Sequence, residues 1–274
     1  MNKAVFITGG HRGTGYAISK LFAKNGMNVF IGARDEKAAA IAAQEFSDKY
    51  GVYSKGYECD LLNNEEQINK IFDDIDASEY FVDTLVLNAA DMALGSDPSK
   101  GLDLWTLPLE DFSRVIETNI AGNFAVARRA AVTMRKHNHG SIVFIGSNTV
   151  YRANQNREAY ISSKGGINAL SKCLAVDLGP YGIRSNVILA GTIKTERWVG
   201  MGKKQIVNGE MTPIGDVSDY EDIANAAWYL GTDLSKNVTG AELTVDGGMS
   251  CQLYPPILNE LKALRDTISN EEDK

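Results

Sequence analysis

Short apolar runs alternate with longer segments of helical periodicity along the whole chain. Seven short runs are predicted to be strands: residues 4–7, 28–32, 54–59, 84–87, 141–145, 185–189 and 241–245. The run at 54–59 is the weakest of them because it is the most polar. The strongest runs are apolar at consecutive positions, as expected for strands of a parallel sheet covered on both faces.

The segments between these runs have the spacing of amphipathic helices. Helices are expected at residues 15–25, 35–50, 64–77, 109–138, 158–179 and 219–231. Strands that alternate with helices imply right-handed crossover connections. The sequence therefore predicts an α/β fold: a single-domain Rossmann-type, doubly wound parallel sheet of about seven strands with helices on both faces.

Two segments depart from this alternation. Residues 192–216 contain four glycines and one proline, a composition that suits a lid over an active site. Residues 251–274 contain a proline pair and then leucines at helical spacing, which predicts a short C-terminal helix. We therefore expect a domain over residues 1–250, including the lid region, and a tail extension over 251–274.

The composition limits the partners and the compartment. The net charge of −7 argues against a nucleic-acid or membrane surface, since both require concentrated Lys and Arg. The three cysteines form no CxxC pair, and the three histidines form no metal-ligand pattern, so no metal is expected. No apolar run approaches the roughly 20 residues of a membrane helix, and the chain enters its first strand without a signal peptide. These features predict a cytoplasmic protein.

A glycine-rich turn, T-G-G-H-R-G-T-G at residues 8–15, joins the first strand to the first helix. Gly9, Gly13 and Gly15 would allow a tight turn in which backbone N–H groups and the helix N-terminus face a pyrophosphate. His11 and Arg12 lie within the same turn and are expected beside the cofactor. The sequence therefore predicts dinucleotide binding at this turn.

The end of the second predicted strand indicates which dinucleotide. An acidic residue there would bind the ribose hydroxyls of NAD, whereas this chain has Ala33 followed by Arg34. Together with Arg12, Arg34 could bind a 2′-phosphate through charge-assisted hydrogen bonds. In the alternative, Arg34 is a solvated residue that pairs with Asp35 or Glu36. We favour NADP(H) over NAD(H).

Tyr160 and Lys164 lie four positions apart in A-Y-I-S-S-K, so on a helix their side chains share one face. A phenol normally ionises at about pH 10, and a nearby ammonium group favours the phenolate. Tyr160 could then give a proton to a carbonyl oxygen or take one from an alcohol. Ser147, at the end of the fifth predicted strand, could hydrogen-bond and polarise the same substrate oxygen.

From Thr8 to about Gly248 the chain resembles the short-chain dehydrogenase/reductase family. The resemblance rests on TGxxxGxG, an asparagine after the fourth strand, Asn119, Ser147, Y-x-x-x-K and the ending V-T-G-A-E-L-T-V-D-G-G. It is closest to the shorter branch that includes 3-oxoacyl-acyl-carrier-protein reductases. It implies an enzyme that transfers a hydride between a nicotinamide and a secondary alcohol or ketone, with Asn119, Ser147, Tyr160 and Lys164 as catalytic residues.

The resemblance also implies further roles. Asp60 and Leu61 would lie near the adenine, Asn88 near the cofactor ribose, and Ile193 and Thr195 at the carboxamide, while Tyr160 and Lys164 would also contact the cofactor. Asn119 would disturb its helix locally and anchor a water of a proton relay. A small carbonyl or alcohol substrate is implied, and so is a homotetramer or homodimer formed through the helices at 109–138 and 158–179.

The substrate is the most open part of the prediction. Tyr151 and Trp198 are candidate substrate contacts, although either could be a loop aromatic that packs on the core. The same chemistry could act on a 3-oxoacyl thioester, a sugar or polyol, or a hydroxysteroid, and it could use NAD(H). A remoter alternative is a dinucleotide-sensing regulator without catalysis. An epimerase or dehydratase of the longer sister branch would need more chain after the sheet.

Overall fold

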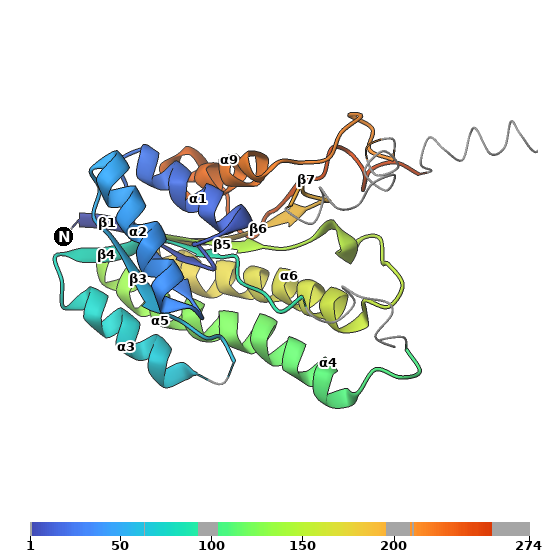
Figure 1. Ribbon diagram of the computed structural model, residues 1–274, viewed down its shortest axis with the longest axis horizontal. Coiled ribbons are helices and arrows are strands. Elements are labelled where there is room, and N and C mark those ends of the chain that lie inside the picture. Colours follow the sequence, from blue (N-terminus) through green and yellow to red (C-terminus); the bar gives the residue numbers. More distant parts are fainter. Residues whose placement is uncertain (1, 63, 93–103, 196–208, 210, 254–274) are drawn as a thin grey trace, which may run out of the picture.

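A single parallel sheet organises the part of the chain that the computed structural model describes, residues 2–62, 64–92, 104–195, 209 and 211–253. Its seven strands have the order β3-β2-β1-β4-β5-β6-β7, so the predicted doubly wound sheet is confirmed (Figure 1). The strands are β1 (Asn2–Thr8), β2 (Asn28–Ala33), β3 (Ser54–Glu58), β4 (Tyr80–Leu87), β5 (Gly140–Ile145), β6 (Ile183–Ala190) and β7 (Glu242–Val245).

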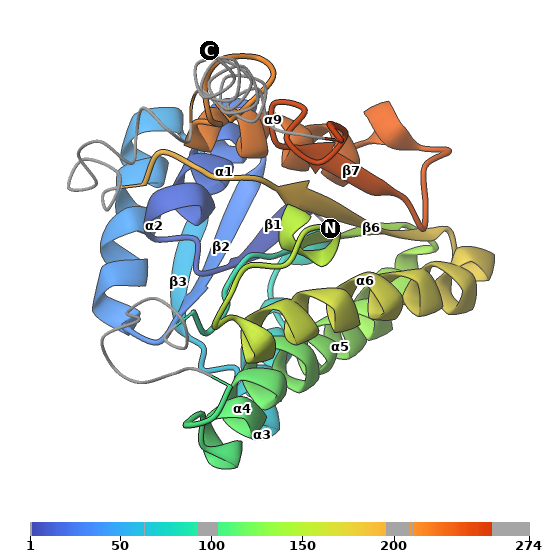
Figure 2. The same cartoon turned by 90° about the vertical axis from the view of Figure 1, so that its right-hand side faces the viewer.

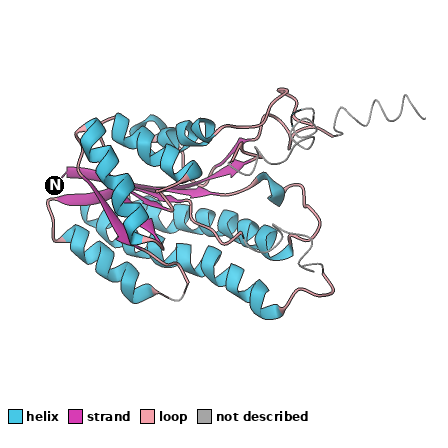
Figure 3. Ribbon diagram, viewed as in Figure 1, coloured by secondary structure: helices cyan, strands magenta, loops and turns pink. Residues whose placement is uncertain are grey.

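Helices cover both faces of the sheet (Figures 1 and 2). One layer contains α1 (Gly13–Lys24), α2 (Glu36–Tyr50) and α9 (Tyr220–Gly231). The other contains α3 (Glu65–Asp76), α4 (Leu109–Ile116), α5 (Asn123–His137) and α6 (Glu158–Leu178). Coloured by secondary structure, the strands form a middle layer between the two groups of helices (Figure 3).

The consecutive apolar positions of the strands supply two separate cores. In β1, Val5 and Ile7 belong to the core under α1, α2 and α9, whereas Ala4 and Phe6 belong to the core under α3, α5 and α6. All four side chains are fully buried. Successive strand residues point to opposite faces, so a strand covered on both faces must be apolar at every position. This alternation is the reason that the strands could be predicted.

The helix expected over 109–138 is interrupted. A π-helical segment, Glu117–Gly122, separates α4 from α5 and contains Asn119. The segment lies against the chain after β3: a Cβ built on Gly122 would come within 2.3 Å of the Leu61 carbonyl oxygen. π-helical bulges within α-helices occur often at functional sites. The local disturbance expected at Asn119 is thus present.

The strand order reverses beside β1, because β2 and β3 lie on one side of it and β4 to β7 on the other. In sheets of this kind, ligands bind beyond the carboxyl ends of the strands at such a switch point. The glycine turn, Asn88 and Ser147 all follow strand ends there. No helix among the described residues has the length and apolarity needed to cross a membrane. Most of the expected lid, with Trp198, and the tail beyond residue 253 lie outside the described residues.

Gly56 of β3 offers a test of the packing between sheet and helix. A Cβ at this position would lie 2.4 Å from backbone atoms of Ala39 and Ala40 in α2. We expect Gly56→Ala to lower the free energy of unfolding by about 1–3 kcal/mol, because the helix must move away from the strand. Denaturant unfolding measures the change. Gly165→Ala is the control, since nothing lies within 4 Å of its built Cβ; equal destabilisation by both variants would contradict the packing.

Candidate active site

The glycine turn after β1 has a backbone that glycine alone permits. A Cβ on Gly15 would lie 2.2 Å from the Gly9 carbonyl oxygen, and Gly9 has a φ of +69°. The turn is fixed to the sheet because the Gly9 N–H donates to the Gly32 carbonyl at 2.7 Å. Helix α1 begins directly after it, with no side-chain cap and no acidic residue in its first turn. Its positive N-terminus therefore fits an anionic group.

Asn88 holds this turn rather than projecting away from it. Its Nδ2 donates to the Thr8 carbonyl at 3.1 Å, and its own backbone N–H donates to Thr8 Oγ1 at 3.0 Å. Ala89 donates its backbone N–H to the same hydroxyl at 3.0 Å. The end of β4 is thereby tied to the end of β1. The side chain of Asn88 positions the turn.

Three side chains with nitrogen donors surround the turn. His11 Nδ1 is buried and has no hydrogen-bond partner among the described residues. Burial lowers the pKa of His11, Arg12 lowers it further and Asp35 raises it, so these groups lie near one another. Arg12 and Arg34 are exposed and form no ion pair within the described part of the chain. The Asp35 carboxylate instead caps α2 by accepting the Ala38 N–H at 3.1 Å.

Asp60 and Leu61 follow β3, and much of their hydrogen-bonding and packing is within the protein. Asp60 Oδ1 accepts the Leu62 N–H at 3.1 Å, and the Asp60 N–H donates to Gln67 Oε1 at 2.8 Å. The Leu61 side chain is buried in the core under α3, α5 and α6. The second carboxylate oxygen of Asp60 accepts no hydrogen bond among the described residues, so it is available to a ligand.

Lys164 is a buried cation beneath Tyr160. Its side chain is 4% exposed and its Nζ donates to the Ile145 carbonyl, at the end of β5, at 2.7 Å. This is its one hydrogen bond among the described residues, so two of its three N–H donors are left for a ligand. Burial lowers the pKa of Lys164 to about 8, because the low dielectric disfavours the charged form.

Tyr160 lies one turn earlier in α6 and is 8% exposed. The Lys164 Nζ is 5.6 Å from the centroid of its ring. Burial raises the pKa of the Tyr160 phenol, while the positive charge of Arg157 and a hydrogen bond with Ser147 lower it. The two residues of the Y-x-x-x-K pattern are therefore adjacent, and the phenol also lies near Ser147.

Ser147 begins the short 3-10 turn Asn148–Val150 after β5. Its Oγ accepts the Thr149 N–H at 3.3 Å and the Thr149 hydroxyl at 2.9 Å. The next residue ties this loop to the segment after β7, since Asn148 Nδ2 donates to Asp246 Oδ2 at 3.1 Å. Ser147 is thus a buried hydroxyl on a loop held from two sides.

Asn119 joins the π-helical segment to both neighbours. Its Nδ2 donates to Ser163 Oγ at 3.0 Å and to the Asp91 carbonyl at 3.2 Å, and its Oδ1 accepts the Asp91 N–H at 2.7 Å. Its backbone carbonyl accepts Asn123 Nδ2 at 2.8 Å. Protein groups therefore engage the Asn119 amide, which fixes α6 relative to the chain after β4.

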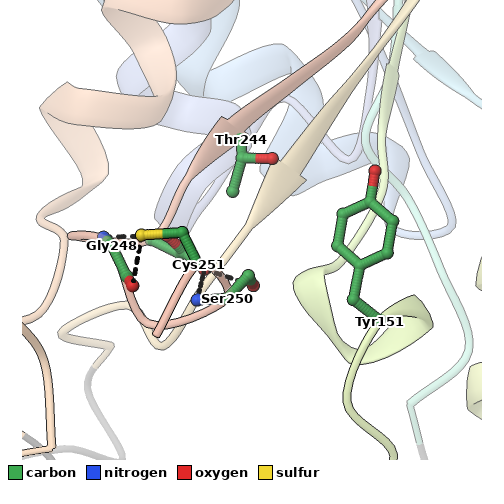
Figure 4. Close-up of a pocket in the computed structure, with 6 residues that line it drawn as sticks. Tyr151, Thr244, Gly248, Ser250 and Cys251 are labelled. Atoms are coloured by element: carbon green, nitrogen blue, oxygen red, sulfur yellow. Dashed lines mark hydrogen bonds between the residues drawn. The ribbon is translucent and has the colours of Figure 1, made fainter. Parts of the chain in front are cut away.

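Tyr151 forms one wall of a cavity of about 570 Å³ (Figure 4). Its hydroxyl donates to Glu242 of β7, and its side chain is 56% exposed. The other described lining residues are Thr244, Asp246, Gly248, Ser250 and Cys251.

The segment after β6 contains Ile193 and Thr195, the residues expected at the carboxamide. Ile193 pairs with Ser218 in an isolated bridge, and its carbonyl accepts the Thr195 N–H at 2.8 Å.

The fold thus brings Ser147, Tyr160 and Lys164 to the end of β5, and Asn119 contacts the same helix through Ser163. Two neighbours of this group were missed in the sequence. Asp91 has no signal, because only the fold brings it to Asn119. Arg157 could have been noticed, since it lies three positions before Tyr160, directly before the predicted helix.

The residues fit a dinucleotide. The glycine turn leaves no room for a Cβ at Gly9 or Gly15, the N-terminus of α1 is uncapped, and His11 Nδ1 has no partner among the described residues. Lys164 has two N–H donors left for a ligand. The first three features gather at the phosphate side, and Lys164 lies at the catalytic tyrosine candidate.

Comparisons with known proteins show the family of the chain. Residues 9–250 match a family model described as enoyl-(acyl carrier protein) reductase. The 3-oxoacyl-(acyl-carrier-protein) reductase of Chlamydia muridarum is 35% identical over 256 residues, which cover 91% of this chain and 98% of the relative.

Two solved structures share the fold at lower identity. One is a gluconate 5-dehydrogenase from Burkholderia cenocepacia in complex with NADP and tartrate, with a TM-score of 0.83, 27% identity and coverage of 92% of this chain and 96% of that one. The other is an NAD⁺-bound xylitol dehydrogenase with a TM-score of 0.79, 28% identity and coverage of 90% and 98%. With these similarities over nearly its whole length, the chain belongs to the short-chain dehydrogenase/reductase family of oxidoreductases.

Proposed function

We propose that the protein is an NADP(H)-dependent oxidoreductase that interconverts a secondary alcohol and a ketone, with Tyr160 as general acid and base. The observation that carries this proposal is the buried pair of Tyr160 and Lys164 on successive turns of α6, below the end of β5. A bound nicotinamide dinucleotide supplies or accepts the hydride. The residues of the chain bind and orient the substrate and the dinucleotide, and they move the proton.

Tyr160 transfers the proton. In reduction its hydroxyl gives a proton to the carbonyl oxygen, and in oxidation its phenolate takes one from the alcohol. The hydroxyl of Ser147, which lies near the phenol, hydrogen-bonds the same substrate oxygen and so stabilises the charge that develops there. Lys164 favours the phenolate through its charge and uses its remaining donors on the nicotinamide ribose.

Asn119 acts on this pair by fixing α6 in place. Its amide bonds to Ser163 and Asp91 hold the helix that bears Tyr160 against the chain after β4. The family role of anchoring a relay water would use the carbonyl of Asn119. That carbonyl already accepts Asn123 Nδ2, but a carbonyl oxygen has a second lone pair for a water.

The cofactor is proposed to be NADP(H). Arg12 and Arg34 follow neighbouring parallel strands and are exposed, and Asp35, the nearest candidate to neutralise Arg34, caps α2 instead. Two guanidinium groups at that ribose would attract a 2′-phosphate. The alternative is NAD(H), as in the xylitol dehydrogenase structure.

The substrate is a small carbonyl or alcohol. A 3-oxoacyl thioester, a sugar acid and a polyol are all named for similar proteins, and one scaffold supports all of them. Tyr151 is proposed as a wall of the substrate pocket, since it lines a cavity four residues after Ser147. Trp198 is kept as a candidate contact, although it lies outside the described residues. Asn119, Ser147, Tyr160 and Lys164 are all present, which disfavours a regulator without catalysis.

The oligomeric state and the extent of the domain are also proposed. The exposed apolar side chains of Phe124 and Val132 in α5 and of Val176 in α6 favour a homodimer or homotetramer formed through these helices. The oxidoreductase domain is proposed to span residues 1–250, with 251–274 as an extension.

Replacing Tyr160 with phenylalanine tests the acid–base assignment. With the fastest substrate from a panel of ketones, ketoses and a 3-oxoacyl thioester, we expect Tyr160→Phe to lower kcat by about 10²–10⁴-fold, because the proton donor is lost. Dinucleotide affinity, followed by NADPH fluorescence, should change little. Tyr181→Phe, at the far end of α6, is the control. Retained activity in Tyr160→Phe would contradict the assignment.

Replacing the two arginines tests the cofactor preference. We expect Arg12→Ala and Arg34→Ala each to lower kcat/KM for NADPH by about 10- to 100-fold, the effect of losing a charged hydrogen bond, with little change for NADH. Lys24→Ala, at the opposite end of α1, controls for loss of charge. A wild-type enzyme with a strong preference for NADH would refute NADP(H) as the cofactor.

A further inference from the structure

Arg157 lies directly on the ring of Tyr160. It is the residue before α6 and reaches forward one turn, so that its guanidinium carbon is 4.6 Å from the centroid of the Tyr160 ring. Lys164, one turn on the other side of Tyr160, is 5.6 Å from the same centroid. The tyrosine is therefore flanked by two cations on its own helix, and the arginine is the closer of the two.

The other groups that the described residues bring to Tyr160 carry no charge. Ser147 approaches from the loop after β5, and Asn119 of the π-helical segment contacts Ser163, which follows Tyr160 by three positions. From α4, Val115 packs against Ala159, next to the tyrosine. Within the described part of the chain, no carboxylate acts on the pKa of Tyr160, whereas Arg157 and Ser147 both lower it. The positive charge of Arg157 therefore acts on the phenol, and Lys164 is the second cation near its ring.

The two cations differ in how their charge depends on pH. Burial lowers the pKa of Lys164 to about 8, so its charge is progressively lost as the pH rises through this value. A guanidinium group is not deprotonated in proteins. Arg157 thus keeps its charge over the whole pH range in which an enzyme of this kind works.

We propose that Arg157 is a positioning residue for the reaction: stacked on the Tyr160 ring, it places a permanent positive charge beside the phenolate that forms in every turnover. This role rests on the proposed function of Tyr160 and adds to it a second cation that the Y-x-x-x-K pattern does not contain.

The test compares Arg157→Gln with Arg157→Lys and with Arg135→Gln. Arg135 is a matched control because its guanidinium carbon lies 4.3 Å from the ring centroid of another tyrosine, Tyr181, at the far end of α6. In alcohol oxidation the phenolate is the base, so the rate rises with pH as the phenol ionises. Without the arginine charge this rise must move to higher pH, because the phenolate is less stable.

We expect Arg157→Gln to lower kcat for oxidation at pH 7 about tenfold, the effect of removing one opposite charge at this distance. KM should change less than about twofold. Arg157→Lys, which keeps a charge without the planar stack, should recover much of the rate and of the pH profile. Arg135→Gln should match the wild type. If Arg157→Gln does not fold by circular dichroism, Arg157→Met, which also removes the charge but keeps an apolar stem, takes its place with the same expected shift.

A second readout does not depend on turnover. The ultraviolet titration of tyrosinate in the wild type, minus that of Tyr160→Phe, isolates Tyr160 from the other tyrosines. The same difference in the Arg157→Gln background should appear at higher pH. Activity in Tyr160→Phe would refute the proposed function, yet this titration would still report whether Arg157 acts on the phenol.

Two results would overturn the role of Arg157. One is a pH profile and a tyrosinate titration of Arg157→Gln that superimpose on those of the wild type. The other is a rise in KM for carboxylate-bearing substrates alone with an unchanged profile, which would make Arg157 a contact for an anionic substrate.

Discussion

The burial of one ammonium group, that of Lys164, is the constraint on which the site depends. A lysine is seldom fully buried, because removal of its charge from water costs free energy. Here the side chain is 4% exposed and makes one hydrogen bond, to the Ile145 carbonyl. Burial shifts the pKa to about 8, which corresponds to a cost of about 3 kcal/mol for the charged form. An interior apolar residue would pack there without that cost, so the lysine is best explained by chemistry.

The sheet places the other groups where this cation can act on them. β5 ends at the carbonyl that holds Lys164, and Ser147 follows two residues later. The π-helical segment brings Asn119 against α6 from the other side, through Ser163. Across the switch point, the ends of β1 and β4 are tied together through Thr8 and Asn88, which shapes the glycine turn. A dinucleotide bound at that turn would extend along the strand ends to Tyr160.

More of the fold than of the candidate site could be predicted from the sequence. Runs such as 4–7 and 141–145 could be recognised because a strand covered on both faces must be apolar at each position, and even the weak run at 54–59 proved to be a strand. The spacing of Tyr160 and Lys164 predicted one helix face, and Ser147 could be placed at a strand end. The contact between Asn119 and Asp91 could not be predicted, because the two residues are distant in sequence and the Asn119 side chain bonds to backbone atoms of Asp91. The ion-pair state of Arg34 also required the structure, in which Asp35 caps α2 and Arg34 forms no ion pair among the described residues.

We infer that Lys164 is a buried cation kept for chemistry at a cost in stability, and the pH dependence of unfolding tests this most directly. The pKa of Lys164 is lower in the folded state than in the unfolded chain, so between about pH 8 and its usual value of 10.5 the unfolded chain binds more protons and folding gains stability as the pH rises. Denaturant unfolding should find Lys164→Met more stable than the wild type at pH 7, with the difference shrinking toward pH 10. Lys172→Met, an exposed lysine of the same helix, should show no such trend. A difference between wild type and Lys164→Met that stays constant across this range would show that burial of the Lys164 charge does not cost stability.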